Sequence, residues 1–174
     1  MKQIEIEKVF LLKKLPSDIY KYPHKVIQVG DFYDSNSVNA LKIRRKGDKY
    51  ELIKKEANSI HNRTEHTINI KKEEFDVLIQ ATVQNHKKQR YFYKLGDYTC
   101  EIDLYQDKLL GYARAEVEFE NEEEMKKFNP PDWFAEEITD INHEIHEDLG
   151  IVTFEEMKKR YAEKGINLIT ILNN

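Results

Sequence analysis

From the N-terminus to about Asn121 the sequence alternates between apolar and polar side chains, and this period of two constrains the fold more than any other feature. Over Ile4–Phe10, read as an extended chain, Glu5 and Glu7 lie on one side and the isoleucines on the other. Turn signals such as Gly47-Asp48 separate the alternating runs. The pattern predicts consecutive antiparallel strands with few helices between them.

Eight strands are expected, at residues 4–15, 24–34, two in the hairpin 39–56, 61–70 and three within 87–120. Helices are expected at 71–83, at 122–128 and once or twice further on. A sheet of so many strands must curl or close to protect its edges. We therefore expect an α+β fold, a closed antiparallel β-barrel (a tunnel) of about eight strands with flanking helices. Residues 1–174 should form one domain, with the barrel at about 1–121 and a C-terminal helical segment at about 122–174.

The balance of charges narrows the range of partners and locations. The chain has 174 residues, of which 34% are charged, but its formal net charge is only −4. This balance does not favour nucleic-acid or membrane binding through an overall field. The sequence holds no apolar run near the roughly 20 residues that span a bilayer, and the N-terminal residues lack the apolar centre of a signal peptide. We expect a cytoplasmic protein.

Charged residues recur on single faces of the expected strands, with one sign on each strand. Lys42 and Arg44 share a face, as do Glu101 with Asp103 and Glu116 with Glu118. Carboxylates from neighbouring strands repel one another unless a divalent cation lies between them, and bases opposite them would bind phosphates. Solvated strand faces are the alternative, because 32 acids in 174 positions give about six acid-x-acid pairs by chance. The pattern alone leaves both interpretations open.

Four blocks of sequence, in order, resemble the CYTH superfamily, the triphosphate tunnel metalloenzymes. They are EIEKVFLLKKLP, LKIRRKGDKYELIKK, RYFYKLGDYTCEIDLY and LLGYARAEVEFENEEEMKKFNPPDWFAEEITD, and together they extend from about Gln3 to Asp140. The superfamily includes inorganic triphosphatases, thiamine triphosphatases and class IV adenylyl cyclases. The resemblance implies an antiparallel barrel whose lumen binds a triphosphate.

The resemblance also implies roles for individual residues. One or two Mg²⁺ or Mn²⁺ ions would be held by catalytic glutamates, with Asp103 as a further metal ligand, and four bases would bind the phosphate chain. The glutamates are Glu5, Glu7, Glu116 and Glu118, and the bases are Lys42, Arg44, Lys55 and Arg90. Two positions depart from the family pattern: Val9 stands where the opening motif has Lys, and Thr67 stands where a middle strand often has Glu.

The function implied is a metal-dependent phosphohydrolase that cleaves the terminal phosphate of a triphosphate. Inorganic triphosphate is preferred over ATP or thiamine triphosphate, because no element for recognising a base or thiamine is evident. A class IV-type adenylyl cyclase is one alternative. A catalytically weak module that binds polyphosphate or nucleotides is another, motivated by Val9 and Thr67. The expected partner is this small molecule, with no nucleic acid and no membrane; a homodimer is left open.

Overall fold

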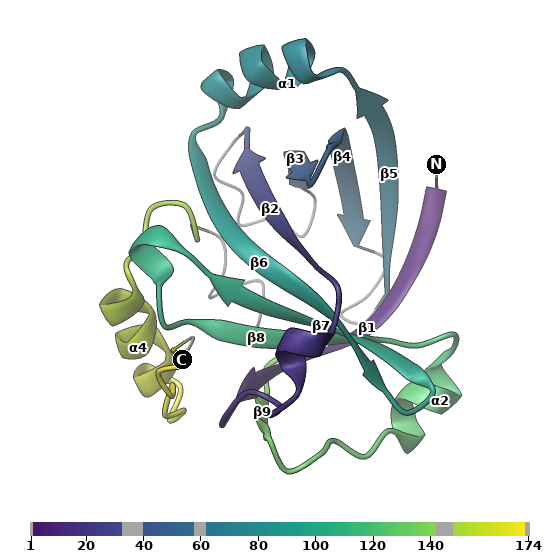
Figure 1. The fold of residues 1–174 in the computed structure, drawn as a ribbon, viewed down its shortest axis with the longest axis vertical. Helices are drawn as coiled ribbons and strands as arrows, with labels where there is room; N and C mark the ends of the chain where they lie inside the picture. Colours follow the sequence, from purple (N-terminus) through teal and green to yellow (C-terminus); the bar gives the residue numbers. More distant parts are fainter. Residues whose placement is uncertain (1, 33–39, 58–61, 142–147, 173–174) are drawn as a thin grey trace.

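The computed structural model describes residues 2–32, 40–57, 62–141 and 148–172, which form mainly β-strands (Figure 1). The strands are β1 (Lys2–Leu12), β2 (His24–Asp31), β3 (Ala40–Lys46), β4 (Lys49–Ala57), β5 (Asn62–Ile70), β6 (Gln84–Leu95), β7 (Tyr98–Tyr105), β8 (Ala113–Glu118) and β9 (Phe134–Glu137). The helices are α1 (Lys72–Leu78), α2 (Glu122–Lys127) and α4 (Phe154–Glu163), with 3-10 turns η1 (Ile19–Lys21), η2 (Ile79–Ala81) and η3 (Asp107–Leu109). Among these helices none is long and apolar enough to cross a membrane.

The nine strands form one sheet with the order β5-β4-β3-β2-β6-β7-β8-β1-β9, and every neighbouring pair is antiparallel. β1 also pairs with β5: its first half lies opposite β5, from Lys2↔His66 to Ile6↔Asn62, whereas Glu7–Leu11 lie opposite β8. The antiparallel, strand-dominated fold expected from the alternation is therefore confirmed.

β9 differs from the sequence-based expectation, because Phe134–Glu137 fall after residue 128, where only helices were expected. β9 pairs with the last residues of β1, and the Phe134 ring stacks on the Phe10 ring with centroids 4.6 Å apart. On this side of β1, β5 pairs with the first half of the strand alone. The second half of β1 is therefore open to another strand. Pairing with β1 explains why β9 forms a strand although its own sequence does not alternate between apolar and polar residues.

The two faces of the sheet have different chemistry. On one face Phe10, Ile102, Ala115 and Val117 belong to a buried apolar cluster that includes Met125 of α2. The opposite face, which we call the inner face, carries Arg44, Arg90 and Glu116. Because side chains alternate along each strand, one register places the charged side chains of the candidate site on this inner face.

Helix α1 packs on the outer side of β3 and β4, where the rings of Phe75 and Tyr50 lie 5.3 Å apart (Figure 1). Gly30 of β2 is required here: a Cβ at this position would come within 2.7 Å of side-chain atoms of Ile79 and Thr82. The missing side chain lets the segment after α1 approach the sheet closely.

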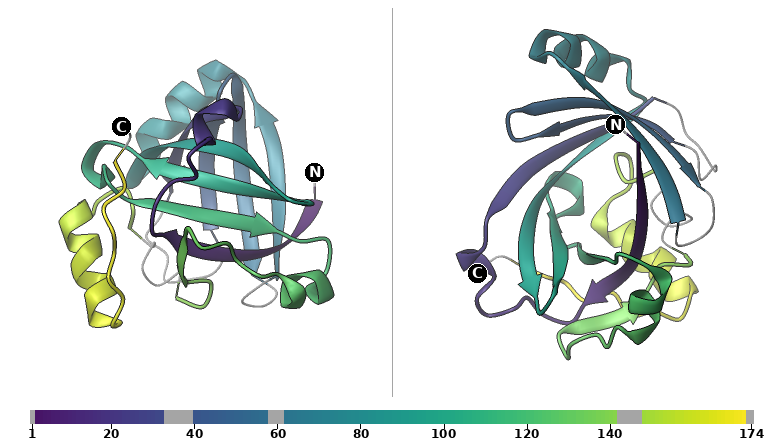
Figure 2. Two further views of the ribbon diagram at one scale, coloured as in Figure 1. Left: turned by 60° about the horizontal axis from the view of Figure 1, so that its bottom comes forward. Right: turned by 90° about the vertical axis from the view of Figure 1, so that its right-hand side faces the viewer.

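The C-terminal region packs against one end of the inner face. Val9, Leu11 and Tyr105 share a buried apolar cluster with α4 residues, of which Met157 and Tyr161 are fully buried. The Tyr161 and Tyr112 hydroxyls lie 2.9 Å apart in this cluster. Figure 2 shows α4 beside the ends of β7 and β8, far from the N-terminus of β1. Helix α4 therefore covers this end of the sheet.

Candidate active site on the inner face

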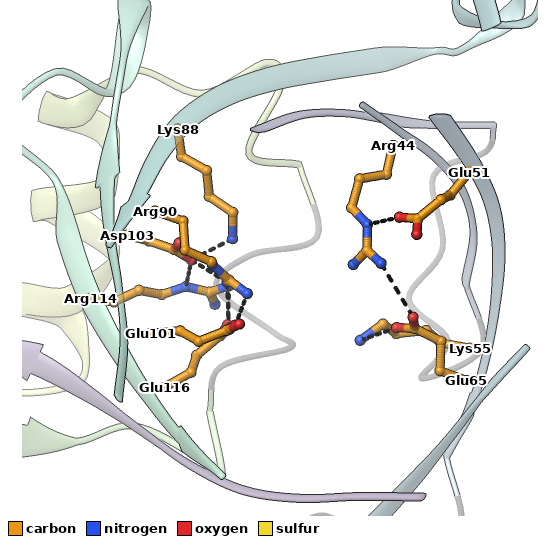
Figure 3. Close-up of polar contacts among 10 residues, drawn as sticks. All are labelled: Arg44, Glu51, Lys55, Glu65, Lys88, Arg90, Glu101, Asp103, Arg114 and Glu116. Carbon is orange, nitrogen blue, oxygen red and sulfur yellow. Dashed lines mark hydrogen bonds and ion pairs between the residues drawn. The ribbon is translucent and has the colours of Figure 1, made fainter. Parts of the chain in front are cut away.

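Three neighbouring strands contribute a set of ion-paired side chains that we call the β6–β8 wall (Figure 3). Arg90 of β6 lies at its centre: Nε and Nη2 each donate to Asp103, at 2.6 Å, and Nη2 also donates to Glu116 at 2.5 Å. Arg90 lies directly opposite Asp103 in the β6–β7 register, and this position brings the guanidinium group of Arg90 to the Asp103 carboxylate. The wall comprises Lys88, Arg90, Glu101, Asp103, Arg114 and Glu116.

Asp103 is the buried anchor of this wall. Its side chain has no exposed surface, and besides Arg90 it accepts a hydrogen bond from Lys88. Burial alone would raise the pKa of Asp103, but Arg90 and Lys88 outweigh it and lower the pKa. The carboxylate is ionised and fixes both basic side chains.

Glu116 is held by two guanidinium groups, since Arg114 Nη2 lies 2.5 Å from Oε1 while Arg90 contacts Oε2. Burial would raise the pKa of Glu116, but Arg114 and Arg90 prevail and hold it well below its usual range. Lys88 shows the reverse balance. Burial, followed by Arg90, lowers the pKa of Lys88 to about 7 despite its bond to Asp103.

A second group of charged side chains, which we call the β3–β5 wall, comes from the other half of the sheet and points toward the first group (Figure 3). Arg44 Nε lies 2.8 Å from Glu51, and Nη2 lies 3.5 Å from Glu65. Lys55 Nζ lies 3.0 Å from the other Glu65 oxygen. Burial raises the pKa of Glu65, yet Lys55 and Arg44 outweigh it and lower the pKa. This wall comprises Arg44, Glu51, Lys55 and Glu65, with Lys42 at its edge.

All four sequence-predicted bases lie on the inner face, but on two walls rather than one. Arg44 and Lys55 face Arg90 across the interior, and Lys42 is paired with Asp31 at 3.0 Å (Figure 3). Each wall also holds carboxylates, so the structure does not separate acids from bases into opposite halves. Thr67, at the position that departs from the family pattern, donates a hydrogen bond to Glu65 at 2.9 Å.

The sequence-predicted acids divide between β1, β7 and β8. Glu7 is buried and lies directly opposite Glu118 in the β1–β8 register, although the Glu118 side chain is exposed. Glu116 is two residues away from Glu118 on the same face. Glu5 belongs to β1, but its side chain lies outside the described residues. Register thus places Glu7, Glu116 and Glu118 on one face of two adjacent strands.

These acids fit a hard divalent cation in ligand type, because carboxylate oxygens are what Mg²⁺ and Mn²⁺ prefer. They are not assembled as a cluster: among the described side chains no three His, Cys, Asp or Glu converge on a common point that could hold a metal. Glu116 is instead engaged by Arg90 and Arg114. Asp103 is surrounded by bases and fits the positioning of Arg90 better than metal binding.

The sequence-based residue set omitted two bases of the β6–β8 wall. Lys88 and Arg114 each lie two residues before a predicted residue, Arg90 and Glu116, and therefore share its face. Extending the period of two by one step on each strand would have included both of them.

Comparison with known proteins agrees with this architecture. A sequence model of the CYTH domain family matches residues 3–151. The chain is 31% identical over 139 residues to an inorganic triphosphatase of Nitrosomonas europaea, covering 78% of this chain and 89% of that protein.

Two solved structures support the fold. The crystal structure of an inorganic triphosphatase is 28% identical with a TM-score of 0.63, covering 84% of this chain and 94% of that one. A Hippeastrum protein studied as an adenylyl cyclase, and described as having a dominant triphosphatase activity, shares the fold at a TM-score of 0.51 and 16% identity. That alignment covers 71% of this chain and 84% of the Hippeastrum chain. The chain belongs to the CYTH domain family.

Proposed function

We propose that this chain is a metal-dependent phosphohydrolase that cleaves the terminal phosphate of a triphosphate, preferably inorganic triphosphate. The observation that carries the proposal is the pair of charged walls that face each other on the inner face, with Arg44 and Lys55 on one side and Arg90 on the other (Figure 3). A ligand that is phosphate throughout matches such surroundings, because each wall offers charge along its length. The 31% identity to an inorganic triphosphatase supports the same substrate.

The pairing between β5 and β1 supports a closed tunnel as the setting for this chemistry. β1 joins β8 at one part of its length and β5 at another, and these two pairings would close the sheet that runs from β5 through β2 and β6 to β8. Closure would place both walls around one enclosed volume, where ionic contacts are stronger than in open water. We propose that residues 1–174 act as a single domain, in which the segment after Asn121 supplies β9 and the cover at one end.

The bases of both walls would bind the phosphate oxygens. Arg44 and Arg90 offer planar forks, whereas Lys55 and Lys42 offer point charges. Their present acidic partners hold these side chains in place, so the substrate meets bases that are already oriented. This pre-organisation favours binding of a chain of phosphates that reaches from one wall to the other.

We propose that Glu7, Glu116 and Glu118, together with Glu5, hold the Mg²⁺ or Mn²⁺ ion. A bound divalent ion would neutralise phosphate charge and help generate the attacking hydroxide. Arg90 and Arg44 would stabilise the charge that develops on the phosphoryl oxygens during transfer. Asp103 would keep the Arg90 fork in the required orientation.

Two other functions remain as alternatives and predict different products. An adenylyl cyclase would convert ATP to cyclic AMP and pyrophosphate, whereas a triphosphatase releases orthophosphate and pyrophosphate from inorganic triphosphate. A binding module would bind these ligands without turnover. Such a module is suggested by Val9, which is an apolar residue on the inner face of β1.

The proposal is tested by measuring orthophosphate release from triphosphate, thiamine triphosphate, ATP and long-chain polyphosphate, with Mg²⁺ and with Mn²⁺. The wild-type protein should hydrolyse triphosphate fastest, and Glu116→Gln should lower kcat by about 100-fold or more. Glu137→Gln is the matched control, because Glu137 pairs with Lys8 away from the inner face. Absence of hydrolysis of every substrate would refute the proposed function. Full activity of Glu116→Gln would refute the assignment of Glu116 alone.

A further inference from the structure

On the inner face, β1 has an apolar side chain at a place where the neighbouring strand β8 supplies a basic one. We propose that Arg114 of β8 is a substrate-binding residue that supplies the positive charge that Val9 of β1 does not. This inference rests on the proposed function, since the ligand is the same triphosphate, but it concerns a residue that the family pattern does not mark.

Val9 is apolar at a position that faces the charged interior. It lies directly opposite Glu116 in the β1–β8 register, so both side chains project from the same face. Its residue surface is 1% exposed, and it belongs to the apolar cluster that includes Leu11 and Met157. The backbone N–H of Val9 donates to Thr139 Oγ1 at 3.0 Å, which fixes β1 at this point. The strand therefore brings no positive charge to Glu116.

Arg114 brings a charge to the same place from the adjacent strand. It lies opposite Leu11 on one side and Asp103 on the other, one step along the inner face from the Val9–Glu116 pair. Cross-strand diagonal neighbours lie within reach of a long side chain. Arg114 Nη2 contacts Glu116 at 2.5 Å, and Nε lies 3.7 Å from Asp103. A basic side chain of β8 therefore lies next to Glu116, the carboxylate opposite Val9.

The structure holds this guanidinium in a fixed orientation. Its central carbon lies 5.8 Å from the centroid of the Tyr105 ring, a contact of cation–π type. A guanidinium has five N–H donors in a planar fork, so one group can hold a carboxylate and a phosphate oxygen together.

A purely structural role would be to neutralise Glu116. Arg90 already contacts the other oxygen of Glu116. Arg90 and Lys88 both form ion pairs with Asp103. Each acid of the wall therefore also contacts a base of β6. The side chain of Arg114 is 10% exposed, like that of Arg90, and in Figure 3 its guanidinium lies beside that of Arg90. This placement fits a second fork for the substrate.

The test combines a loss with a rescue across the two strands. Arg114→Gln keeps an amide donor for Glu116 but removes the charge, and it should raise the KM for triphosphate ~10-fold or more with a smaller change in kcat. Val9→Lys combined with Arg114→Gln should recover most of that loss. Val9→Lys alone should not improve on the wild type. Arg160→Gln, which removes the ion pair between Arg160 of α4 and Asp148, is the control for loss of a partly buried arginine–carboxylate pair.

A folded Arg114→Gln protein with the KM of the wild type would overturn the inference, and so would a folded double variant with no recovery. A crystal structure of the wild-type protein with triphosphate decides the question without any variant. The Arg114 guanidinium should then lie within hydrogen-bonding distance of a phosphate oxygen. Triphosphate bound between the walls but out of reach of Arg114 would refute this inference alone, whereas no binding of triphosphate would refute the proposed function.

Discussion

Lys88 donates a hydrogen bond to Asp103, yet burial and the adjacent Arg90 lower the pKa of Lys88 to about 7. The two observations agree because burial and the like charge of Arg90 outweigh the attraction of Asp103 and Glu116 for the Lys88 cation. Lys88 is therefore a buried base whose positive charge the protein alone does not fully compensate. A phosphate chain beside it would supply the missing negative charge.

We expect Lys88→Met to stabilise the protein and to weaken its binding of triphosphate. Methionine is similar in length and removes the penalty for burying a cation, while Asp103 keeps both bonds from Arg90. The free energy of unfolding at pH 7 should rise by about 1–3 kcal/mol. Chemical denaturation measures this change, and Lys87→Met, an exposed neighbour, is the control. A less stable Lys88→Met protein would show that the Lys88–Asp103 pair is net stabilising.

The pH dependence of stability gives an independent test of the same residue. The folded protein holds Lys88 with a pKa of about 7, whereas the ordinary pKa of a lysine is 10.5. Between these values the unfolded chain binds more protons than the folded one, so Lys88 makes stability rise with pH from about 7 to about 10.5. Below pH 7 the full free-energy cost of burying the charged Lys88 side chain is present. The difference in unfolding free energy between wild type and Lys88→Met should shrink over this window. A constant difference would contradict the lowered pKa.

The C-terminal helix should be part of the folding unit. Met157 of α4 is fully buried in the cluster that includes Val9 and Tyr105. Met157→Ala should lower the free energy of unfolding by about 2–5 kcal/mol, because it leaves a cavity in that cluster. Lys159→Ala, at an exposed position of the same helix, should change it little. Thermal denaturation with one transition is expected. Loss of α4 structure while the sheet remains folded would separate the tail from the domain.

The sequence was sufficient to predict the face on which a side chain lies where the strand itself alternates between apolar and polar residues. Lys42 and Arg44 were placed on one face because their strand alternates clearly, and the register confirms it, whereas Arg90 was placed through the family resemblance. The pairing of β1 with β5 rests on contacts between residues about 60 positions apart, which no local pattern encodes. The same limit applies to β9, whose four residues pair with β1 because that stretch of β1 has an open side.

Lys88 and Arg114 were missed for local reasons. Lys88 lies in the run KKQR, where consecutive charges hide the phase of the alternation. Arg114 lies between Ala113 and Ala115, whose small side chains give little indication of which face is apolar. The structure resolves both ambiguities because cross-strand partners fix the phase. The orientation of the Arg90 fork on Asp103 could not be predicted from spacing alone.

The central claim is that the inner face between the two walls holds the triphosphate. Titration calorimetry with inorganic triphosphate tests it directly, comparing the wild-type protein with Arg44→Gln and Arg45→Gln. Arg44 contacts Glu51 and Glu65 on the inner face, whereas Arg45 is exposed on the other face and donates to the Gly47 carbonyl at 3.1 Å. We predict that Arg44→Gln raises the Kd ~10-fold or more and that Arg45→Gln leaves it unchanged. Equal affinity in all three proteins would contradict binding between the walls.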